Sequence, residues 1–378
     1  MTIVDESRAA STAELLWSAC APAPNGPAVA AAVAAGADLD LAAREALIQR
    51  LSGMVTRGLQ AGGVDTSGAW AQEMLRDAAR CRAHADLVLR QLGVKALEPL
   101  ASAGVEAVVF KGASLAERYP ALGLRTMDDV DLILPSEFHP AAIDALTKAG
   151  WRVVRPAGRV YYDVALVHPQ LPGLPVELHR ALSTWHIWAN GPSATDLWER
   201  RVPQTVFGTA AFGLPPELEL VALAGHASKP FHLFDRLIWS VDVAVVIDAA
   251  SRAAPIDWDD VDREARRVGC RTAVAVLLSH ARHLGASVPD EMCVPAATRT
   301  RRKAVAPLFA PDWPVVPNNT YRRRLEFSVV DGWQRRLAMT LAWSATPSFV
   351  GAPGRLLSLA RAGMQRWWRL RSMPTPRP

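Results

Sequence analysis

The stretch VEAVVFKGASLAERYPALGLRTMDDVDLIL, residues Val105 to Leu134, decides the fold. Its first apolar run ends abruptly at KGAS, residues 111–114, and after a helix-like connection the chain reads DVDLIL, residues 129–134. Because successive side chains of a strand point to opposite faces, Asp129 and Asp131 are expected to project from one face. Two such carboxylates repel each other, and a divalent cation removes that penalty; Mg²⁺ prefers carboxylate oxygens together with a substrate phosphate. The alternative is two exposed carboxylates at the start of a strand.

The turn that follows the first apolar run is suited to phosphate. Gly112 lets the backbone approach a ligand closely, and backbone N–H groups and the Ser114 hydroxyl can then contact phosphate oxygens. Lys111 and Arg125 are candidate counter-charges, because Arg suits bidentate phosphate contact and Lys acts as a point charge. The alternative is that Ser114 only occupies the first turn of a helix and that the two cations form surface ion pairs.

A later segment supplies a third acid. Glu177 lies in a short apolar segment, and His179 shares its face by the two-residue period of a strand. On a neighbouring strand Glu177 would complete a carboxylate triad with Asp129 and Asp131, and His179 would steady a phosphate or the acceptor. The alternatives are a Glu at a strand edge that faces water and a structural His.

These residues resemble the signature of the DNA polymerase beta-like nucleotidyltransferase superfamily, a glycine turn followed by Asp-x-Asp in an apolar strand and a later third carboxylate. More closely, the chain is similar to a bacterial family of uncharacterised nucleotidyltransferases. The residues that carry the likeness are Phe110-Lys111-Gly112, Ala113-Ser114, Tyr119-Pro120, Arg125, Asp129-Val130-Asp131-Leu132 and Glu177-Leu178-His179. The third acid is Glu where that family more usually has Asp, and the likeness is specific over about residues 105–180.

The resemblance implies an α+β fold in which a small mixed-sheet nucleotidyltransferase core is flanked by N-terminal and C-terminal helical regions. It also implies metal-dependent transfer of an NMP group from an NTP, such as ATP, to an acceptor hydroxyl or similar group, with release of pyrophosphate. Two Mg²⁺ ions, with Mn²⁺ as the alternative, would be held by the catalytic carboxylates Asp129, Asp131 and Glu177. The nucleotide would be bound by Lys111, Gly112, Ser114, Arg125 and His179.

The resemblance leaves the acceptor open among a small molecule, a peptide and a protein. Two other functions stay open. One is a non-catalytic member of the fold that only binds a nucleotide or a peptide. The other is a nucleotidyltransferase that modifies tRNA or another RNA, which the basic balance of the chain allows but no recognisable RNA-binding module supports.

Changes in the spacing of apolar residues divide the chain into three predicted regions: a helical region at 1–96, the core at 97–214 and a second helical region at 215–378. Within the first two regions, apolar spacing predicts helices over 39–59, 70–92, 97–104, 112–119 and 138–149, the last capped by Ser136. Strands are predicted over 105–110, 129–134, 151–155, 161–167 and 176–179. The N-terminal helices are expected to pack around the core, with acceptor binding as the alternative.

Composition places the chain among soluble cytoplasmic proteins. A net charge of +5 permits an anionic partner without requiring one. No apolar run reaches about 18 residues, so a spanning helix is not expected, and MTIVDESRAAST at the N-terminus lacks a secretory signal. The four cysteines are scattered and are predicted to be reduced thiols rather than a zinc site.

Two further stretches carry charge in an apolar setting. Asp242 lies in an apolar helix over 237–247 and is expected to form an ion pair with Arg236 or His226. The alternative is that it faces the catalytic cleft. The C-terminal sequence GRLLSLARAGMQRWWRLRSMPTPRP holds six Arg and no acid. It predicts an amphipathic helix that packs on the body of the protein, with weak peripheral membrane contact as the alternative.

Overall fold

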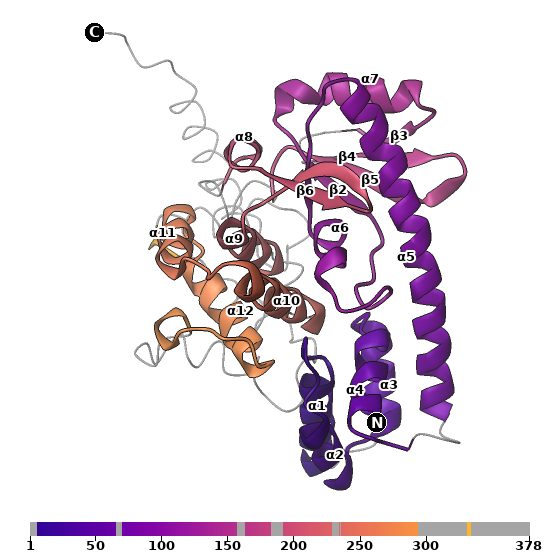
Figure 1. Ribbon diagram of the computed structural model, residues 1–378, viewed down its shortest axis with the longest axis vertical. Coiled ribbons are helices and arrows are strands. Elements are labelled where there is room, and N and C mark those ends of the chain that lie inside the picture. The colour runs from indigo at the N-terminus through magenta and orange to yellow at the C-terminus, as the bar shows by residue number, and fades with distance from the viewer. Residues whose placement is uncertain are drawn as a thin grey trace, which may run out of the picture.

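The computed structural model describes residues 6–65, 70–156, 163–182, 192–228, 234, 236–293 and 331–333. These residues form the expected α+β architecture, in which a mixed sheet lies between helices from the two ends of the chain (Figure 1). Part of the strand expected at 161–167 and the basic stretch at the C-terminus lie outside the described residues.

The sheet has seven strands in the order β3-β4-β5-β2-β1-β7-β6. Their bounds are β1 (Val108–Phe110), β2 (Val130–Ile133), β3 (Arg152–Arg155), β4 (Asp163–His168), β5 (Leu171–His179), β6 (Val202–Val206) and β7 (Thr209–Gly213). Strand β2 is central: it pairs antiparallel with β1 and parallel with β5. All four residues of β2 are buried, which explains why the strand is apolar except for Asp131.

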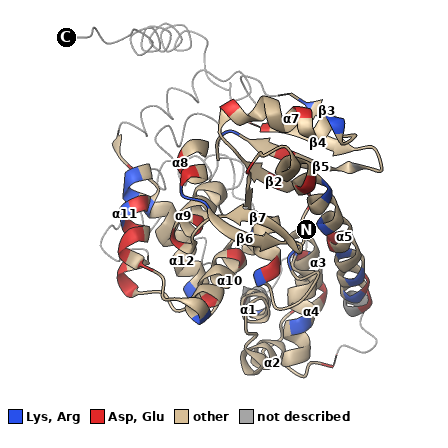
Figure 2. Ribbon diagram, turned by 45° about the horizontal axis from the view of Figure 1, so that its top comes forward, with Lys and Arg blue, Asp and Glu red and all other residues tan. Residues whose placement is uncertain are grey.

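Helices from both ends of the chain surround the sheet (Figure 2). The N-terminal region contains α1 (Glu6–Ala19), α2 (Gly26–Ala34), α3 (Leu39–Ile48), α4 (Ser52–Ala61) and α5 (Trp70–Ser102). The core contributes α6 (Gly112–Leu115), η1 (Ala116–Arg118), η2 (Ser136–Phe138), α7 (His139–Lys148) and α8 (Ala194–Glu199). The C-terminal region contains α9 (Pro216–Ala227), α10 (Leu237–Ala253), α11 (Trp258–Val268), α12 (Arg271–His283) and η3 (Asp290–Met292).

Helix α5 merges two of the helices that the sequence predicted. Leu92, Ala96 and Leu100 are buried at four-residue spacing, so one apolar stripe continues through the predicted gap and past Pro99. The helix runs from the N-terminal helices along one side of the sheet (Figure 1). It crosses the boundary drawn at residues 96 and 97, and the division into three regions stays a prediction.

Other expected elements need local correction. The helix predicted over 39–59 is broken into α3 and α4 at Arg50, whose φ is 60°. Ser136 does not cap a helix; it opens the short η2 turn, and α7 begins at His139 with a proline in its first turn. The hairpin β6–β7 was not predicted. Its two-residue loop, Phe207-Gly208, has positive φ at both positions, the requirement of a type I′ turn.

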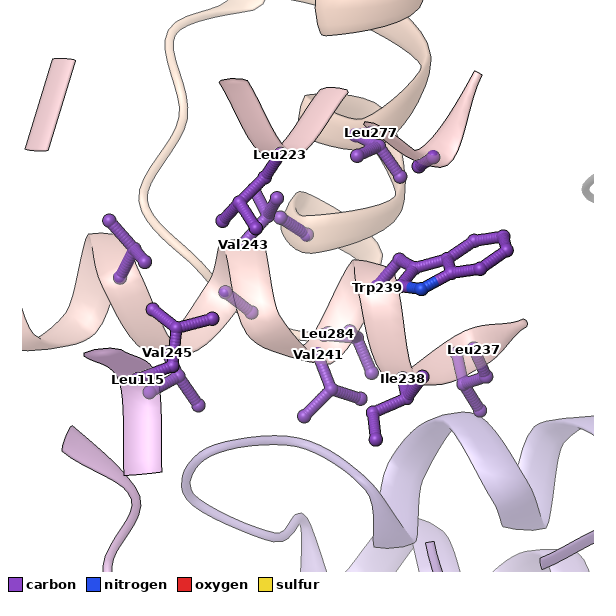
Figure 3. Packing of buried hydrophobic residues seen from close by; sticks show 14 of the residues in the cluster. Leu115, Leu223, Leu237, Ile238, Trp239, Val241, Val243, Val245, Leu277 and Leu284 are labelled. Atoms are coloured by element: carbon purple, nitrogen blue, oxygen red, sulfur yellow. The ribbon is translucent and has the colours of Figure 1, made fainter. Parts of the chain in front are cut away.

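The two faces of the sheet pack into two hydrophobic clusters. Val109 and Leu132 belong to a cluster with α5 and α7, whereas Phe110 and Ile133 belong to a cluster with the N-terminal helices and α9 to α12. Figure 3 shows the second cluster around α10, where Leu115 of α6 lies beside α10. Because alternate residues of β2 enter different clusters, Asp131 shares the face of Ile133 and points toward the C-terminal helices.

A buried ion pair ties the core to α10. Asp242 accepts hydrogen bonds from Arg125 Nε at 2.7 Å and Nη2 at 2.9 Å, and from the Tyr119 hydroxyl at 2.7 Å. The sequence correctly predicted an ion pair for Asp242, but the predicted partners, Arg236 and His226, were wrong. Burial and the neighbouring Asp242 charge raise the pKa of Tyr119 well above its ordinary value.

The described cysteines agree with the prediction of free thiols, since none forms a disulfide within the described residues. No helix among those residues is both long enough and apolar enough to cross a membrane.

We expect Asp242→Ala to lower the free energy of unfolding by about 3–5 kcal/mol, because it leaves the buried Arg125 without its carboxylate. Asp248→Ala is the matched control: it lies on the same helix and breaks only an exposed pair with Arg252, which contributes less than about 0.5 kcal/mol. Urea unfolding of both variants measures the difference. Equal losses would show that the pair does not join α10 to the core.

Candidate active site

A cavity of about 250 Å³ is lined by residues from the three predicted regions of the chain. The core lines it with residues 111–112, 125–129 and Asp131. The N-terminal region contributes Arg50, and the C-terminal region contributes His226, Arg236, Ile238 and Trp239. The cavity therefore has a carboxylate wall, from the start of β2, and several basic side chains.

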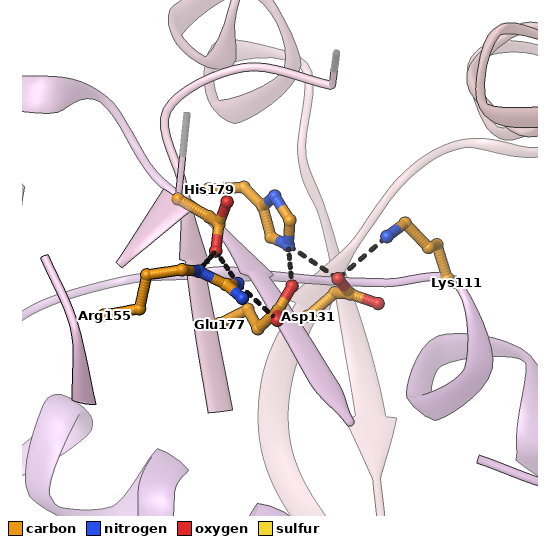
Figure 4. A network of polar contacts seen from close by, with 6 residues as sticks. Lys111, Asp131, Arg155, Glu177 and His179 are labelled. Carbon is orange, nitrogen blue, oxygen red and sulfur yellow. Dashed lines mark hydrogen bonds and ion pairs between the residues drawn. The ribbon is translucent and has the colours of Figure 1, made fainter. Parts of the chain in front are cut away.

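Strand pairing places the third acid beside the second. In the parallel pair of β2 and β5, Asp131 lies opposite Glu177, and Ile133 lies opposite His179. Asp131, Glu177 and His179 share one face of the sheet. His179 Nε2 lies 2.6 Å from Asp131 Oδ1 and 3.4 Å from Glu177 Oε2 (Figure 4). Alternation along two adjacent strands thus gathers three potential ligands from two distant parts of the sequence.

Asp131 is an almost fully buried carboxylate, 2% exposed, with two basic partners. Lys111 Nζ donates a hydrogen bond of 2.8 Å to the Oδ1 atom that also contacts His179. Burial alone would raise the pKa of Asp131, but the Lys111 charge and the His179 hydrogen bond hold it well below its ordinary value. For His179, burial acts to lower the pKa, but its bonds to Asp131 and Glu177 raise it. Asp131 and His179 therefore each favour the charged form of the other.

Glu177 is held by a residue that the sequence did not single out. Arg155 at the end of β3 donates from Nη2 to Glu177 Oε1 at 2.6 Å and also binds the buried Asp163 at the start of β4 (Figure 4). Although burial acts to raise the pKa of Glu177, His179 and Arg155 lower it. These contacts arise from the antiparallel order of β3, β4 and β5, so no local sequence pattern could have indicated them.

Asp129 lies directly before β2, not within it as predicted, and it lines the cavity. Among the described residues it makes no hydrogen bond or ion pair. The charge of Asp131, then burial, and then the charge of Glu177 raise the pKa of Asp129 to about 7, although Lys111 and His179 act in the opposite direction. When the Asp129 carboxylate is charged, the charges of Asp131 and Glu177 repel it.

The donor set fits a divalent cation. Asp131, Glu177 and His179 each offer a ligand atom, and these atoms lie within 4.8 Å of one another. Carboxylate oxygens with one imidazole and no thiolate suit a hard or intermediate ion such as Mg²⁺ or Mn²⁺. The repulsion at Asp129 is the kind that a cation relieves. This set differs from the predicted one, because it contains His179 in place of Asp129.

The model of a family described as "Uncharacterised nucleotidyltransferase" matches residues 35–286, more than half of the chain. The chain belongs to this family. It is therefore a nucleotidyltransferase, and an NTP is its implied substrate. No curated protein and no solved structure gives a significant match. The family match extends beyond the predicted core into both helical regions, which supply Arg50 and Arg236 to the cavity.

Two predicted nucleotide contacts of this nucleotidyltransferase, Ser114 and His179, are not among the residues that line the cavity. Ser114 is fully buried, and its Oγ donates to Glu219 Oε1 at 3.1 Å and lies 3.3 Å from Gln204 Oε1. Glu219 is also paired with Arg118. The short helix α6 therefore turns the Ser114 hydroxyl toward α9 and away from the cavity.

The other three predicted contacts, Lys111, Gly112 and Arg125, line the cavity. Lys111 has φ 54° and ψ −128°, an unusual backbone conformation for a residue with a side chain, and its amine reaches Asp131. A Cβ atom at Gly112 would lie 2.9 Å from Met127 Cγ, so close packing requires glycine there. Arg125 lines the cavity but also binds Asp242. Asp128 also lines the cavity and pairs with Arg50.

We expect Asp129→Asn to stabilise the metal-free protein, and to do so more at pH 8 than at pH 5. With a pKa of about 7 in the folded state, Asp129 retains a proton that the unfolded chain has already lost. Its contribution to stability therefore falls as pH rises from about 4 to 7. The expected gain at pH 8 is on the order of 1 kcal/mol, reduced from the full pKa shift because the side chain is partly exposed.

Urea unfolding in EDTA at the two pH values measures this gain. Asp128→Asn is the control, because it removes an adjacent carboxylate that already has a cationic partner. A gain for Asp129→Asn that is the same at both pH values would contradict the assignment of repulsion at this position.

Proposed function

We propose that this nucleotidyltransferase moves an NMP group from an NTP to a hydroxyl or similar group on a small molecule, peptide or protein, and releases pyrophosphate. The observation that carries the proposal is the placement of Asp131 and Glu177 side by side on β2 and β5, with the uncompensated Asp129 in the adjoining cavity. The catalytic core would be residues 97–214, and the reaction would take place in the cytoplasm, where NTPs are abundant.

Asp129, Asp131 and Glu177 would hold the divalent cations, two Mg²⁺ ions or Mn²⁺ in their place. When bound, the cations would neutralise phosphate charge and orient the α-phosphate. His179 would fix the orientation of the Asp131 carboxylate through its 2.6 Å contact. Lys111, on the other side of the same carboxylate, lines the cavity and would add a positive charge near the nucleotide.

The reaction replaces one phosphorus–oxygen bond with another. The acceptor oxygen bonds to the α-phosphorus, the bond from this phosphorus to the oxygen of the β-phosphate breaks, and pyrophosphate leaves with that electron pair. The acceptor proton passes to Glu177, which is ionised at neutral pH because His179 and Arg155 lower its pKa. The chain contributes positioning and a preorganised set of charges, which together supply most of the rate in such displacements.

One observation favours a second candidate, a non-catalytic nucleotide-binding member of the family. Asp131 and Glu177 already have cationic partners in Lys111 and Arg155. A site that is neutralised in this way can persist without metal and could bind a nucleotide without transferring it. Turnover distinguishes the two candidates.

We expect the protein to release pyrophosphate from at least one NTP in a Mg²⁺- or Mn²⁺-dependent manner when a cell extract supplies the acceptor. ATP is the first nucleotide to test, and labelled NTP identifies the molecule that acquires the NMP group. Asp131→Asn should reduce the rate by at least about 10²-fold, because it removes a carboxylate from the reacting centre. Asp144→Asn, on the exposed surface of α7, is the control.

Thermal unfolding of both variants confirms that they are folded. Binding of an NTP without any transfer would support the second candidate. Full transfer by a folded Asp131→Asn variant would exclude the proposed role of the β2 carboxylate.

A further inference from the structure

Most charges that line the cavity are paired. The pairs are Lys111 with Asp131, Arg50 with Asp128, and Arg125 with Asp242, which lies behind the cavity wall. Two lining charges have no ion-pair partner among the described residues: the carboxylate of Asp129 and the guanidinium of Arg236. One unmatched negative charge and one unmatched positive charge in the same cavity suit a ligand that brings both a cation and an anion.

The basic residues gather although they come from distant parts of the chain. Arg50 follows α3, Arg125 precedes β2, and Arg236 precedes α10. Burial lowers the pKa of Arg50 first, and the charges of Arg236, Arg82 and Arg125 lower it further, against the opposing effect of Asp128. These cations are therefore close enough to repel one another, and an anion between them would remove that cost.

The N-terminus of α10 opens on the same cavity. The helix is 17 residues long, has no acidic residue in its first turn and has no side-chain cap at Arg236. Gln49 Oε1 accepts a hydrogen bond of 2.8 Å from Leu237 N. Ile238 and Trp239 line the cavity, and Figure 3 shows both at this end of α10. The positive pole of the helix dipole therefore adds to the charge of the arginines.

The Ser114 hydroxyl, by contrast, lies outside the cavity. The glycine turn thus lacks the hydroxyl that was expected to contact phosphate oxygens. We propose that Arg50 and Arg236, together with the N-terminus of α10, form the subsite for the β- and γ-phosphates of the NTP. This inference rests on the proposed function and extends it, because it assigns the triphosphate tail to residues outside the predicted core.

The chemistry of the subsite suits a leaving group. Guanidinium groups bind phosphate oxygens through two parallel N–H donors, which fixes orientation as well as charge. The pair with Asp128 engages only part of the five-donor Arg50 guanidinium. As the bond to the β-phosphate breaks, negative charge grows on pyrophosphate, and Arg50 and Arg236 would stabilise it there. The nucleotide would then contact all three regions of the chain at once.

Binding of inorganic tripolyphosphate without metal, measured by titration calorimetry at low salt, tests the subsite directly. We expect Arg236→Gln and Arg50→Gln each to weaken binding by at least about 10-fold and to raise the KM for the NTP by a similar factor. Arg236→Lys and Arg50→Lys should retain part of the affinity, because the charge stays while the bidentate geometry is lost. Arg263→Gln, in an exposed pair on α11, is the matched control and should bind as the unaltered protein does.

Thermal unfolding shows whether each variant is folded, and the conservative Lys variants test the charge if a Gln variant is not. Folded Gln variants that bind tripolyphosphate as tightly as Arg263→Gln, or that keep the KM for the NTP, would overturn the subsite even if transfer proceeds. Weaker binding by both variants, in a protein that never releases pyrophosphate, would support the anion subsite and refute only the proposed reaction.

Discussion

The arrangement of the sheet depends on the buried carboxylate of Asp131, which needs charged partners. Burial of an unpaired carboxylate costs several kcal/mol, so a charged group must accompany it into the sheet. Lys111 approaches from the turn after β1, and His179 approaches from β5. These are the two strands that flank β2. The strand order β5-β2-β1 is therefore favoured by the charge of Asp131 as well as by the apolar residues around it.

Because Asp131 and Glu177 already have cationic partners, folding of the sheet does not require a bound metal. A site whose ligands are unpaired in the absence of metal can fold only with the ion, as small zinc domains do. Here Asp131 has Lys111 and His179, and Glu177 has Arg155, so the sheet is complete without a cation. Repulsion is concentrated at Asp129, at the edge of the cavity. The attraction for a cation is thus placed where a nucleotide can reach it, and not in the interior of the sheet.

The sequence revealed the acids because their placement depends on a local rule. Alternation in a strand puts Glu177 and His179 on one face, and pairing with β2 brings that face to Asp131. The orientation of Ser114 obeys no such rule, since its partner Glu219 is 105 residues away. Arg50 belongs to a helical region that the sequence indicated as packing around the core, with acceptor binding as the alternative. Its role at the cavity depends on how the helices dock, which spacing along the chain does not encode.

Backbone strain gives an independent reason to treat Arg50 and Lys111 as functional. Their φ values are 60° and 54°, and a positive φ costs a residue with a Cβ atom on the order of 1 kcal/mol or more. Glycine would remove that cost at either position but would also remove the cation. Both residues line the cavity, and Thr126 Oγ1 holds the strained turn by donating to Arg50 O at 3.2 Å. Strain retained at two cationic positions of one cavity is better explained by an anionic ligand than by packing, because packing needs neither charge.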